Sequence, residues 1–299
     1  MREGNHPHPE ATAWRVHHAS AAGASPLLFD SPHSWRDWPA NAPPIAASHE
    51  ALCSSWDAWV DELWADAAEG RAPVLAACFH RAYIDANRAR DDIDEQLLDA
   101  PWTPPPRPSD KSARGFGLLR RYILPGMALY AGKLSVQDVR QRIANCYDPY
   151  HEKLAALIEA AHARHGLSVH IDCHSMKSRG NAMNEDNGQP RPDLVVSDLE
   201  GSSADGGLVR WIAERLVAQG LRVRINDPYR GGELIRRHGR PQAGRHSLQI
   251  EINRALYMDE RCFERHEGYA RLAAQLRAFV GELLQALQDG QLPHRPPPA

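Results

Sequence analysis

The stretch Pro73-Val-Leu-Ala-Ala-Cys-Phe79, followed closely by Arg81-Ala-Tyr-Ile-Asp-Ala-Asn-Arg88, indicates the kind of fold that this chain adopts. The first segment is an apolar run that follows Gly70 and predicts a buried strand. The second places two arginines, an asparagine and an aspartate directly after that strand. A guanidinium grips a carboxylate through two parallel hydrogen bonds. The sequence therefore predicts a pocket for an acidic small molecule, or a loop in which Asp85 and Arg88 pair with each other.

Outward from this strand, patterns typical of helices and strands alternate along the chain. Helical spacing and capping residues predict helices at 56–69, 135–147, about 149–166, 205–219 and about 263–288. Short apolar or alternating runs predict further strands at 167–173, 221–226 and 247–253. Strands separated by helices favour an α/β sandwich with a mostly parallel sheet. In such sheets the functional side chains collect at the carboxyl ends of the strands.

The two ends of the chain differ in composition from its middle. Residues 1–24 are small and polar and are expected to form a loose leader, and residues 291–299 are expected to form a proline-rich tail. No long linker rich in proline or glycine separates them. Residues 25–290 are therefore predicted to form a single domain.

Charge and cysteine usage exclude several classes of partner. The net charge of −3, with 35 basic and 38 acidic residues, favours neither nucleic acid nor an anionic membrane. No apolar run of about 18 residues predicts a membrane span, and the start lacks the apolar core of a signal peptide. The five cysteines form no CxxC pair, so neither a disulfide framework nor a thiolate zinc site is expected. The cytoplasm is the expected location, and the oligomeric state is not indicated.

Histidines and carboxylates follow or end the expected strands. His33 follows the short apolar run that begins at Leu27, and alternation places His170, Asp172 and His174 on one face of their strand. The same alternation places Gln249, Glu251 and Asn253 together.

Imidazole and carboxylate are ligands of catalytic zinc, and a nearby glutamate then takes a proton from the bound water. His33 and His174 are the candidate ligands, or they belong with the surface and capping histidines among the chain's 16. His170 lies deeper and is expected to satisfy a core hydrogen bond.

Six motifs occur in an order that resembles one protein family. They are Ser31-Pro-His-Ser34, Arg81-x-Tyr-Ile-Asp-x-Asn-Arg88, Tyr147-x-Pro-Tyr-His151, Ile171-Asp-x-His-Ser-Met176, Asn226-x-Pro-Tyr-x-Gly-Gly232 and Leu248-Gln-Ile-Glu-Ile-Asn-Arg-x-Leu-Tyr-Met258. In order and spacing they resemble the N-formylglutamate amidohydrolases (deformylases), and the second motif is also similar to aspartoacylase. The resemblance implies a three-layer α/β/α sandwich with a mixed, mostly parallel sheet, similar to the zinc carboxypeptidases (phosphorylase/hydrolase-like).

The resemblance implies a zinc site and a catalytic base. His33 and His174 match the two histidine ligands of the family. The carboxypeptidase relatives take their third ligand from a glutamate three residues after the first histidine, and Arg36 occupies that place here. Asp57 matches an alternative third ligand, or it is a plain acid at a helix start. Glu251 matches the glutamate base of the fold relatives.

The resemblance also implies substrate-binding and supporting residues. Arg81 matches the arginine that polarises the scissile carbonyl, and Asn87 with Arg88 matches the pair that holds the substrate's carboxylate. Further expected substrate contacts and side chains that support the site from behind are Tyr229, Gly231, Gly232, Arg254, Asp85, Asp172 and His246. For these the sequence leaves simpler roles open: a turn for the glycine pair, a nearby acid as the partner of Arg254, and a structural role for Tyr229, His238 and His246.

The expected activity is that of a hydrolase with one Zn²⁺ per chain. The implied substrate is an N-formyl or N-acyl acidic amino acid, with N-formyl-L-glutamate giving formate and L-glutamate in histidine breakdown. The alternatives are an N-acyl-amino-acid or short-peptide hydrolase on the same scaffold, and a metal-free protein that binds acidic small molecules. One departure from the family is Trp35, where a glycine is usual. Its ring is expected to narrow the pocket or to redirect the loop.

Overall fold

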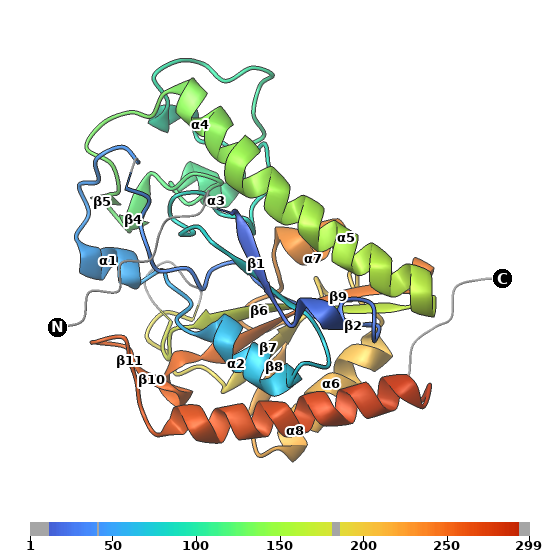
Figure 1. Ribbon diagram of the computed structural model, residues 1–299. Helices are drawn as coiled ribbons and strands as arrows, with labels where there is room; N and C mark the ends of the chain where they lie inside the picture. Colours follow the sequence, from blue (N-terminus) through green and yellow to red (C-terminus); the bar gives the residue numbers. More distant parts are fainter. Residues whose placement is uncertain (1–11, 41, 181–185, 293–299) are drawn as a thin grey trace, which may run out of the picture.

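The computed structural model describes residues 12–40, 42–180 and 186–292 and is built around one mixed sheet (Figure 1). The sheet has seven strands in the order β1-β3-β2-β6-β9-β7-β8. β3, β2, β6 and β9 are mutually parallel, whereas β1 and β7 run antiparallel to their neighbours β3 and β9. The strand bounds are β1 Trp14–His17, β2 Leu27–Ser31, β3 Val74–Ala77, β6 Ser168–Met176, β7 Leu194–Ser197, β8 Val223–Ile225 and β9 Arg245–Asn253.

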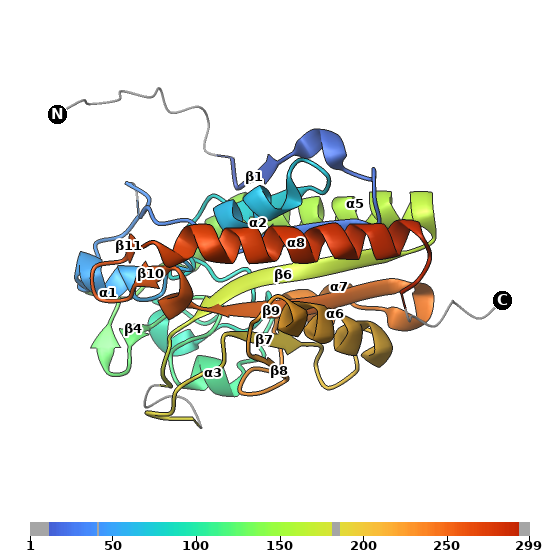
Figure 2. The same ribbon diagram turned by 90° about the horizontal axis from the view of Figure 1, so that it is seen from below.

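Helices cover both faces of the sheet, so the chain forms the expected three-layer arrangement. α2, α6 and α8 pack side by side on one face, and α5 and α7 cover the other (Figures 1 and 2). The helix bounds are α1 His49–Cys53, α2 Val60–Ala68, α3 Asp110–Ala113, α4 Val136–Arg142, α5 Asp148–His165, α6 Gly206–Ala218, α7 Glu233–His238 and α8 Gly268–Gln288. Two small hairpins pair β4 Tyr122–Leu124 with β5 Met127–Ala128 and β10 Met258–Asp259 with β11 Glu264–Arg265.

Strand alternation separates an apolar face from a polar one in the centre of the sheet. Val169, Ile171 and Cys173 of β6 join the core beneath α2, α6 and α8. The intervening residues of β6 therefore point to the opposite face. In β9 the apolar residues Leu248, Ile250 and Ile252 join the same core. The predicted grouping of polar side chains on one face of each strand is confirmed.

His170 has the core role that its depth in the strand suggests. Its Nδ1 lies 2.7 Å from the Ser247 hydroxyl and its Nε2 lies 2.8 Å from the Asp30 carboxylate. The hydroxyl of Tyr150 donates to the same aspartate at 2.5 Å. His170 thus links β6 to β2, β9 and α5 within the buried layer.

The expected loose leader is wrong for the part that the structure describes. Trp14–His17 forms β1, which pairs with β3 along the edge of the sheet. The segment is short and half-exposed, so it lacks the apolar run by which a buried strand is recognised. β7 was likewise not predicted, although its four residues are all buried. Residues 1–11 and 293–299, which include most of the predicted tail, lie outside the described part.

The two helices expected around Pro149 form one continuous rod. Ser135 caps its start by accepting a hydrogen bond from the Asp138 N–H at 3.0 Å, as the sequence indicates. A π-helical turn at Ile143–Tyr147 joins α4 to α5, and Pro149 lies in the first turn of α5, where proline is tolerated. Gly166 ends the rod in the left-handed conformation. None of the described helices is both long and apolar enough to cross a membrane.

Candidate active site

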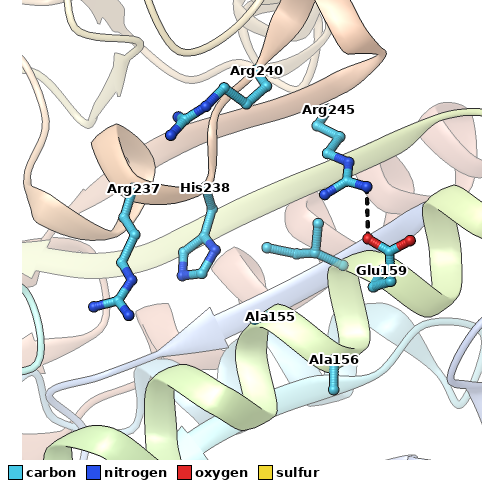
Figure 3. A pocket seen from close by; sticks show the side chains of 8 residues that line it. Ala155, Ala156, Glu159, Arg237, His238, Arg240 and Arg245 are labelled. Carbon is cyan, nitrogen blue, oxygen red and sulfur yellow. Dashed lines mark hydrogen bonds and ion pairs between the residues drawn. The ribbon is translucent and has the colours of Figure 1, made fainter.

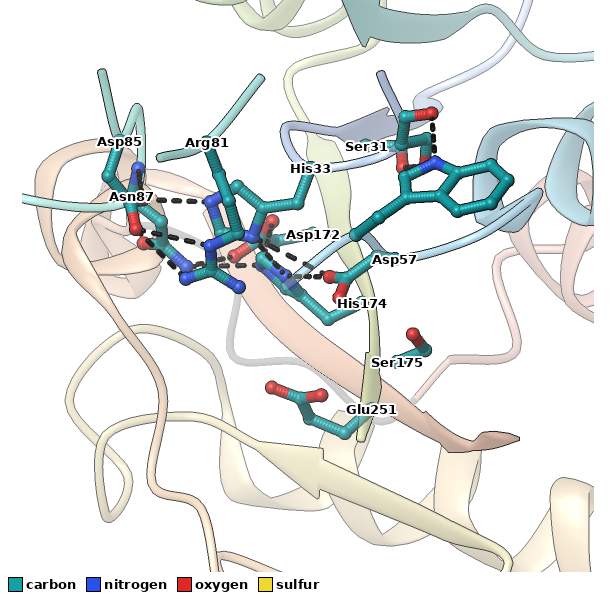
Figure 4. Close-up of polar contacts among 12 residues, drawn as sticks. Ser31, His33, Asp57, Arg81, Asp85, Asn87, Asp172, His174, Ser175 and Glu251 are labelled. Carbon is teal, nitrogen blue, oxygen red and sulfur yellow. Dashed lines mark hydrogen bonds and ion pairs between the residues drawn. The ribbon is translucent and has the colours of Figure 1, made fainter. Parts of the chain in front are cut away.

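Three side chains from separate segments converge where the parallel strands end. His33 lies in the loop after β2, His174 near the end of β6, and Asp57 shortly before α2, which begins four residues later than expected. The two histidine Nδ1 atoms lie 3.1 Å apart, and Asp57 Oδ2 lies 3.1 Å from His174 Nδ1 and 3.5 Å from His33 Nδ1 (Figure 4). All three side chains are buried, and they form the one such group of potential metal ligands found among the described residues.

The outer nitrogens of both imidazoles are held by further carboxylates. Asp85 Oδ1 lies 2.8 Å from His33 Nε2, and Asp172 Oδ1 lies 2.8 Å from His174 Nε2. A carboxylate at Nε2 favours the proton on that nitrogen and leaves the Nδ1 lone pair free. Both Nδ1 atoms point toward Asp57. Two imidazole nitrogens and one carboxylate oxygen fit a catalytic zinc ion, which takes three protein ligands and leaves one position open.

The charges around this cluster favour a cation. Burial works against a charged imidazole, but the carboxylates of Asp172 and Asp57 raise the pKa of His174 well above its ordinary value. Burial would raise the pKa of Asp57, yet hydrogen bonds with His174 and His33 keep that pKa well below its usual range. Burial and the Arg81 guanidinium lower the pKa of His33, which favours its neutral form. Positive charge is thus stabilised at the point where the ligand atoms meet, and metal binding would displace the His174 proton.

Glu251 lies beside this cluster because of the register between β6 and β9. It is directly paired with His174 in the two parallel strands. The Gln249 side chain donates a hydrogen bond to Glu251 Oε1 at 3.0 Å, which leaves the other oxygen available to a reactant. Burial raises the pKa of Glu251. A carboxylate with a raised pKa is a stronger base, which suits proton transfer near neutral pH.

The segment 81–88 wraps around the same cluster, but not through the pairing of Asp85 with Arg88. Arg81 donates to Asp85 Oδ2 from Nη2 at 2.9 Å and from Nε at 3.3 Å. Arg88 instead donates to the backbone carbonyls of Phe116 and Asn87. Asp85 therefore orients Arg81 and His33 together, and Arg88 is held by the backbone.

The amide of Asn87 lies between β6 and β9. Its Nδ2 is 3.1 Å from His174 Nε2 and donates to Asp172 Oδ2 at 3.3 Å. Its Oδ1 accepts a hydrogen bond from the Leu234 N–H. Gly232 permits this approach, because a Cβ at that position would lie 2.3 Å from Asn87 Oδ1. The sequence left two roles open for the glycine pair, a plain turn or a close approach of the backbone to the site. The position of Gly232 agrees with the close approach.

Arg254 has the acidic partner that the sequence left open. Its Nη2 donates to Asp57 Oδ1 at 2.9 Å and its Nε to the Ser175 hydroxyl at 3.0 Å. Asp57 is thereby fixed with one oxygen on Arg254 and the other toward the histidines. Tyr229 lines the same cavity, with the Arg191 guanidinium 5.0 Å from its ring centre.

The cavity that these residues share measures about 300 Å³. Its wall also contains Lys111, Arg114 and Arg120, which the sequence analysis missed. Lys111 and Arg114 lie in and just after the one-turn helix α3, and Arg120 lies in the irregular segment that follows. No strand end or repeated spacing marks them. The only available signal was the density of basic residues between 111 and 121.

His246 is not brought to this cavity. It lies five residues before Glu251, near the start of β9, and its Nδ1 accepts a hydrogen bond from the Asp205 N–H. The supporting role expected for His246 is therefore wrong. Arg36, which occupies the place of the missing glutamate, is exposed, and its guanidinium lies 5.2 Å from the Trp56 ring centre.

Another cavity, of about 450 Å³, lies between α5, α7 and the start of β9 (Figure 3). Its wall contains Arg237, Arg240 and Arg245, and Arg245 pairs with Glu159. It contains none of the potential metal ligands and no candidate base. The active-site candidate is therefore the smaller cavity at the carboxyl ends of the strands.

Trp35 does not narrow the pocket. It is absent from the cavity wall, and its ring lies 5.8 Å from the Arg15 guanidinium at the edge strand β1. We expect Trp35→Gly to leave kcat/KM close to that of the wild type, because Trp35 is not part of the cavity wall. Steady-state kinetics of the purified variant measures this. A large loss of kcat/KM at unchanged folding would show that the ring positions His33 through the loop.

Comparison with known proteins agrees with the order of the motifs. A profile described as N-formylglutamate amidohydrolase matches residues 25–258. The chain is 28% identical over 269 residues to the N-formylglutamate deformylase of Pseudomonas aeruginosa, covering 89% of this chain and 93% of that protein. It is 26% identical over 273 residues to the N-formylglutamate deformylase of Pseudomonas putida, again covering 89% and 93%.

Solved structures give the same relationship in three dimensions. The N-formylglutamate amidohydrolase from Ralstonia eutropha JMP134 superposes with a TM-score of 0.86 at 35% identity, covering 93% of this chain and 99% of that one. A gene product from Agrobacterium tumefaciens superposes with a TM-score of 0.65 at 19% identity, covering 93% and 96%, and shares the fold.

Proposed function

The chain belongs to the N-formylglutamate amidohydrolase family and is a hydrolase, and we propose that it converts N-formyl-L-glutamate and water to formate and L-glutamate. The proposal depends chiefly on one observation. A group of two histidines and an aspartate, a buried glutamate and the guanidiniums of Arg81 and Arg88 border a single cavity of about 300 Å³. Such a cavity has room for a small amino-acid derivative.

The metal that this proposal requires is one Zn²⁺ per chain, held by His33, Asp57 and His174. When bound, it would lower the pKa of a water molecule and polarise the formyl carbonyl. The orientation of both Nδ1 atoms toward Asp57 supports this ligand set. Arg254 supports it further, since it holds Asp57 through the oxygen that faces away from the histidines. The rival interpretation as a metal-free binding protein assumed that the third ligand is missing, and the position of Asp57 beside both histidines supports the enzyme instead.

Glu251 is the proposed base. Its free oxygen takes the proton from the attacking water and passes it to the amide nitrogen as the C–N bond breaks, so that L-glutamate departs as an amine. Arg81 is the proposed partner of the carbonyl oxygen as negative charge develops there. Asp85 fixes Arg81 before the substrate arrives, and such preorganised charge is usually the largest contribution to catalysis.

Asn87 and Arg88 are proposed to orient the α-carboxylate of the substrate. Both line the cavity, and each is held by a backbone contact: Asn87 accepts from the Leu234 N–H, and Arg88 donates to the Phe116 carbonyl. Fixing the carboxylate next to the scissile amide aligns the carbonyl with the attacking water. Tyr229, Gly231 and Gly232 also line the cavity, and Gly232 lies against the Asn87 side chain.

The test is formate release from N-formyl-L-glutamate by the purified protein, compared with N-acetyl-L-glutamate, N-formimino-L-glutamate and N-formyl-L-aspartate. We expect the first substrate to have the highest kcat/KM. Activity should disappear after dialysis against a chelator and return with Zn²⁺. Preference for another acyl group would redirect the proposal to a different N-acyl-amino-acid hydrolase. Histidine breakdown and a cytoplasmic location stay predictions from the sequence.

A further inference from the structure

The cavity carries more positive charge than its carboxylates balance on one side. Arg81, Arg88, Arg120 and Lys111 all line the cavity, and Asp85 forms ion pairs with two of them, Arg81 and Arg120. Two of these guanidiniums already use two of their five N–H donors within the protein. Arg81 gives Nε and Nη2 to Asp85, and Arg88 gives Nε and Nη1 to backbone carbonyls. A second anionic group of the substrate would therefore find more free donors on the other two cations.

Arg120 has the largest unused donor capacity of the three guanidiniums. It is buried, and its Nε has no hydrogen-bond partner among the described residues. Its one acidic contact is Asp85, at 3.7 Å from Nη2, which is too long for a hydrogen bond. A buried polar group without a partner is costly. Burial and the Arg81 charge accordingly lower the pKa of Arg120, which is the effect of a cation that lacks a sufficient counter-charge.

Lys111 reaches the same wall from α3. No hydrogen bond or ion pair of its ammonium group is found within residues 12–40, 42–180 and 186–292. The nearby Arg88 charge, together with partial desolvation at the cavity wall, lowers the pKa of Lys111 to about 8, although the side chain is exposed. A second cation next to Arg88 is unfavourable in the free protein, and a bound carboxylate would relieve the repulsion.

We infer that Arg120 and Lys111 form a second carboxylate subsite, which takes the side-chain carboxylate of the acidic amino acid. The inference deepens the proposed function and depends on it for the identity of the substrate. Asn87 is in contact with His174 and therefore lies next to the place of the scissile amide. The α-carboxylate is attached to the carbon that bears the amide nitrogen, whereas the side-chain carboxylate lies two methylenes farther away. The cations outside the 81–88 segment are therefore assigned to the more distant group.

The experiment compares three probes that differ in one charge. They are N-formyl-L-glutamate, N-formyl-L-glutamine, which lacks the side-chain charge, and N-formyl-L-isoglutamine, which lacks the α-charge. We expect Arg120→Gln and Lys111→Gln each to lower kcat/KM for the glutamate derivative by about 10- to 100-fold, the usual effect of removing a charged hydrogen bond. The values for N-formyl-L-glutamine should change little, so that the preference for glutamate collapses.

Matched variants separate a charge effect from a structural one. Arg120→Lys should recover part of the preference, and Arg107→Gln, an exposed arginine outside the cavity wall, should leave all three values unchanged. Equal losses on all three probes would mean that Arg120 acts only by positioning Asp85, and they would overturn the inference. Loss of discrimination against isoglutamine instead would assign the pair to the α-carboxylate and also overturn it. If Arg120→Gln does not fold, Lys111→Gln, which changes a residue of a short exposed helix, decides the result.

A binding measurement keeps this test independent of turnover. Calorimetric titration of the zinc-loaded protein with L-glutamate and with L-glutamine should show tighter binding of glutamate, and Lys111→Gln should abolish the difference. A wild-type protein that prefers glutamate but releases no formate would contradict the proposed reaction and leave the subsite supported. A wild-type protein that binds both compounds equally would overturn the subsite, whatever its activity.

Discussion

Replacing Glu251 with glutamine is expected to lower kcat by about 10²- to 10⁴-fold, the range typical of a positioned general base. An amide of the same shape can still accept the hydrogen bond from Gln249, so the local structure should persist. It cannot take a proton from water at neutral pH. Because Glu251 is not among the three potential metal ligands, the zinc content should stay that of the wild type. Formate release and metal analysis by mass spectrometry, made on the same preparation, measure both quantities.

The matched control for this variant is Glu260→Gln. Glu260 bonds the backbone and hydroxyl of Ser178 and does not line the catalytic cavity. Its replacement should leave kcat near the wild-type value. Near-full activity of the Glu251 variant would reject the assignment of the base. Loss of zinc together with activity would instead place the Glu251 side chain on the metal.

The central strands could be predicted because their sequences carry the fold in their own pattern. Polar and apolar residues alternate over 168–174 in β6 and over 247–253 in β9, and both of these segments are buried on both faces. The alternation within each strand determines which of its side chains share a face. It does not determine the register, that is, which residue of β6 lies opposite which residue of β9. The pairing of His174 with Glu251 is a property of two segments far apart in the chain.

Edges and irregular segments were missed for a different physical reason. β1 is held by hydrogen bonds to β3 and by partial burial, and neither leaves a strong periodic signal. Arg120 lies in a segment between α3 and β4 without regular structure, where side-chain direction follows from tertiary contacts alone. His246 was instead predicted near the site and lies elsewhere. Its strand was predicted, but position along a strand decides whether a side chain reaches the carboxyl-end cavity, and His246 lies at the other end.

The candidate metal ligands were predicted from local motifs, with one exception that needed a long-range contact. His33 was predicted from the loop after a short apolar run, and His174 from the alternation of its strand. Asp57 could equally be a plain acid near a helix start, and nothing within its own segment distinguishes the two roles. The distinction comes from Arg254, 197 residues later, whose guanidinium holds Asp57 Oδ1 at 2.9 Å. A helix-start acid needs no such partner.

Asp57→Asn is accordingly expected to reduce bound zinc from about one per chain to a small fraction, and activity with it, because the amide removes the one negatively charged ligand. The amide keeps the shape of the side chain and can still accept from Arg254, so the fold should be preserved, as circular dichroism and thermal unfolding would show.

Asp85→Asn provides the graded comparison. Asp85 touches His33 at its outer nitrogen and is not a potential ligand itself. Outer partners of this kind usually contribute about 10- to 100-fold to metal affinity, so this variant should retain zinc at saturating metal but lose it at zinc concentrations at which the wild type is still occupied. Competition with a zinc-binding dye measures both affinities. The ligand set proposed here predicts that Asp57→Asn weakens binding more than Asp85→Asn does. The reverse order would move the third ligand from the segment before α2 to the loop after β3, and Asp57 would then serve only to hold Arg254 in place.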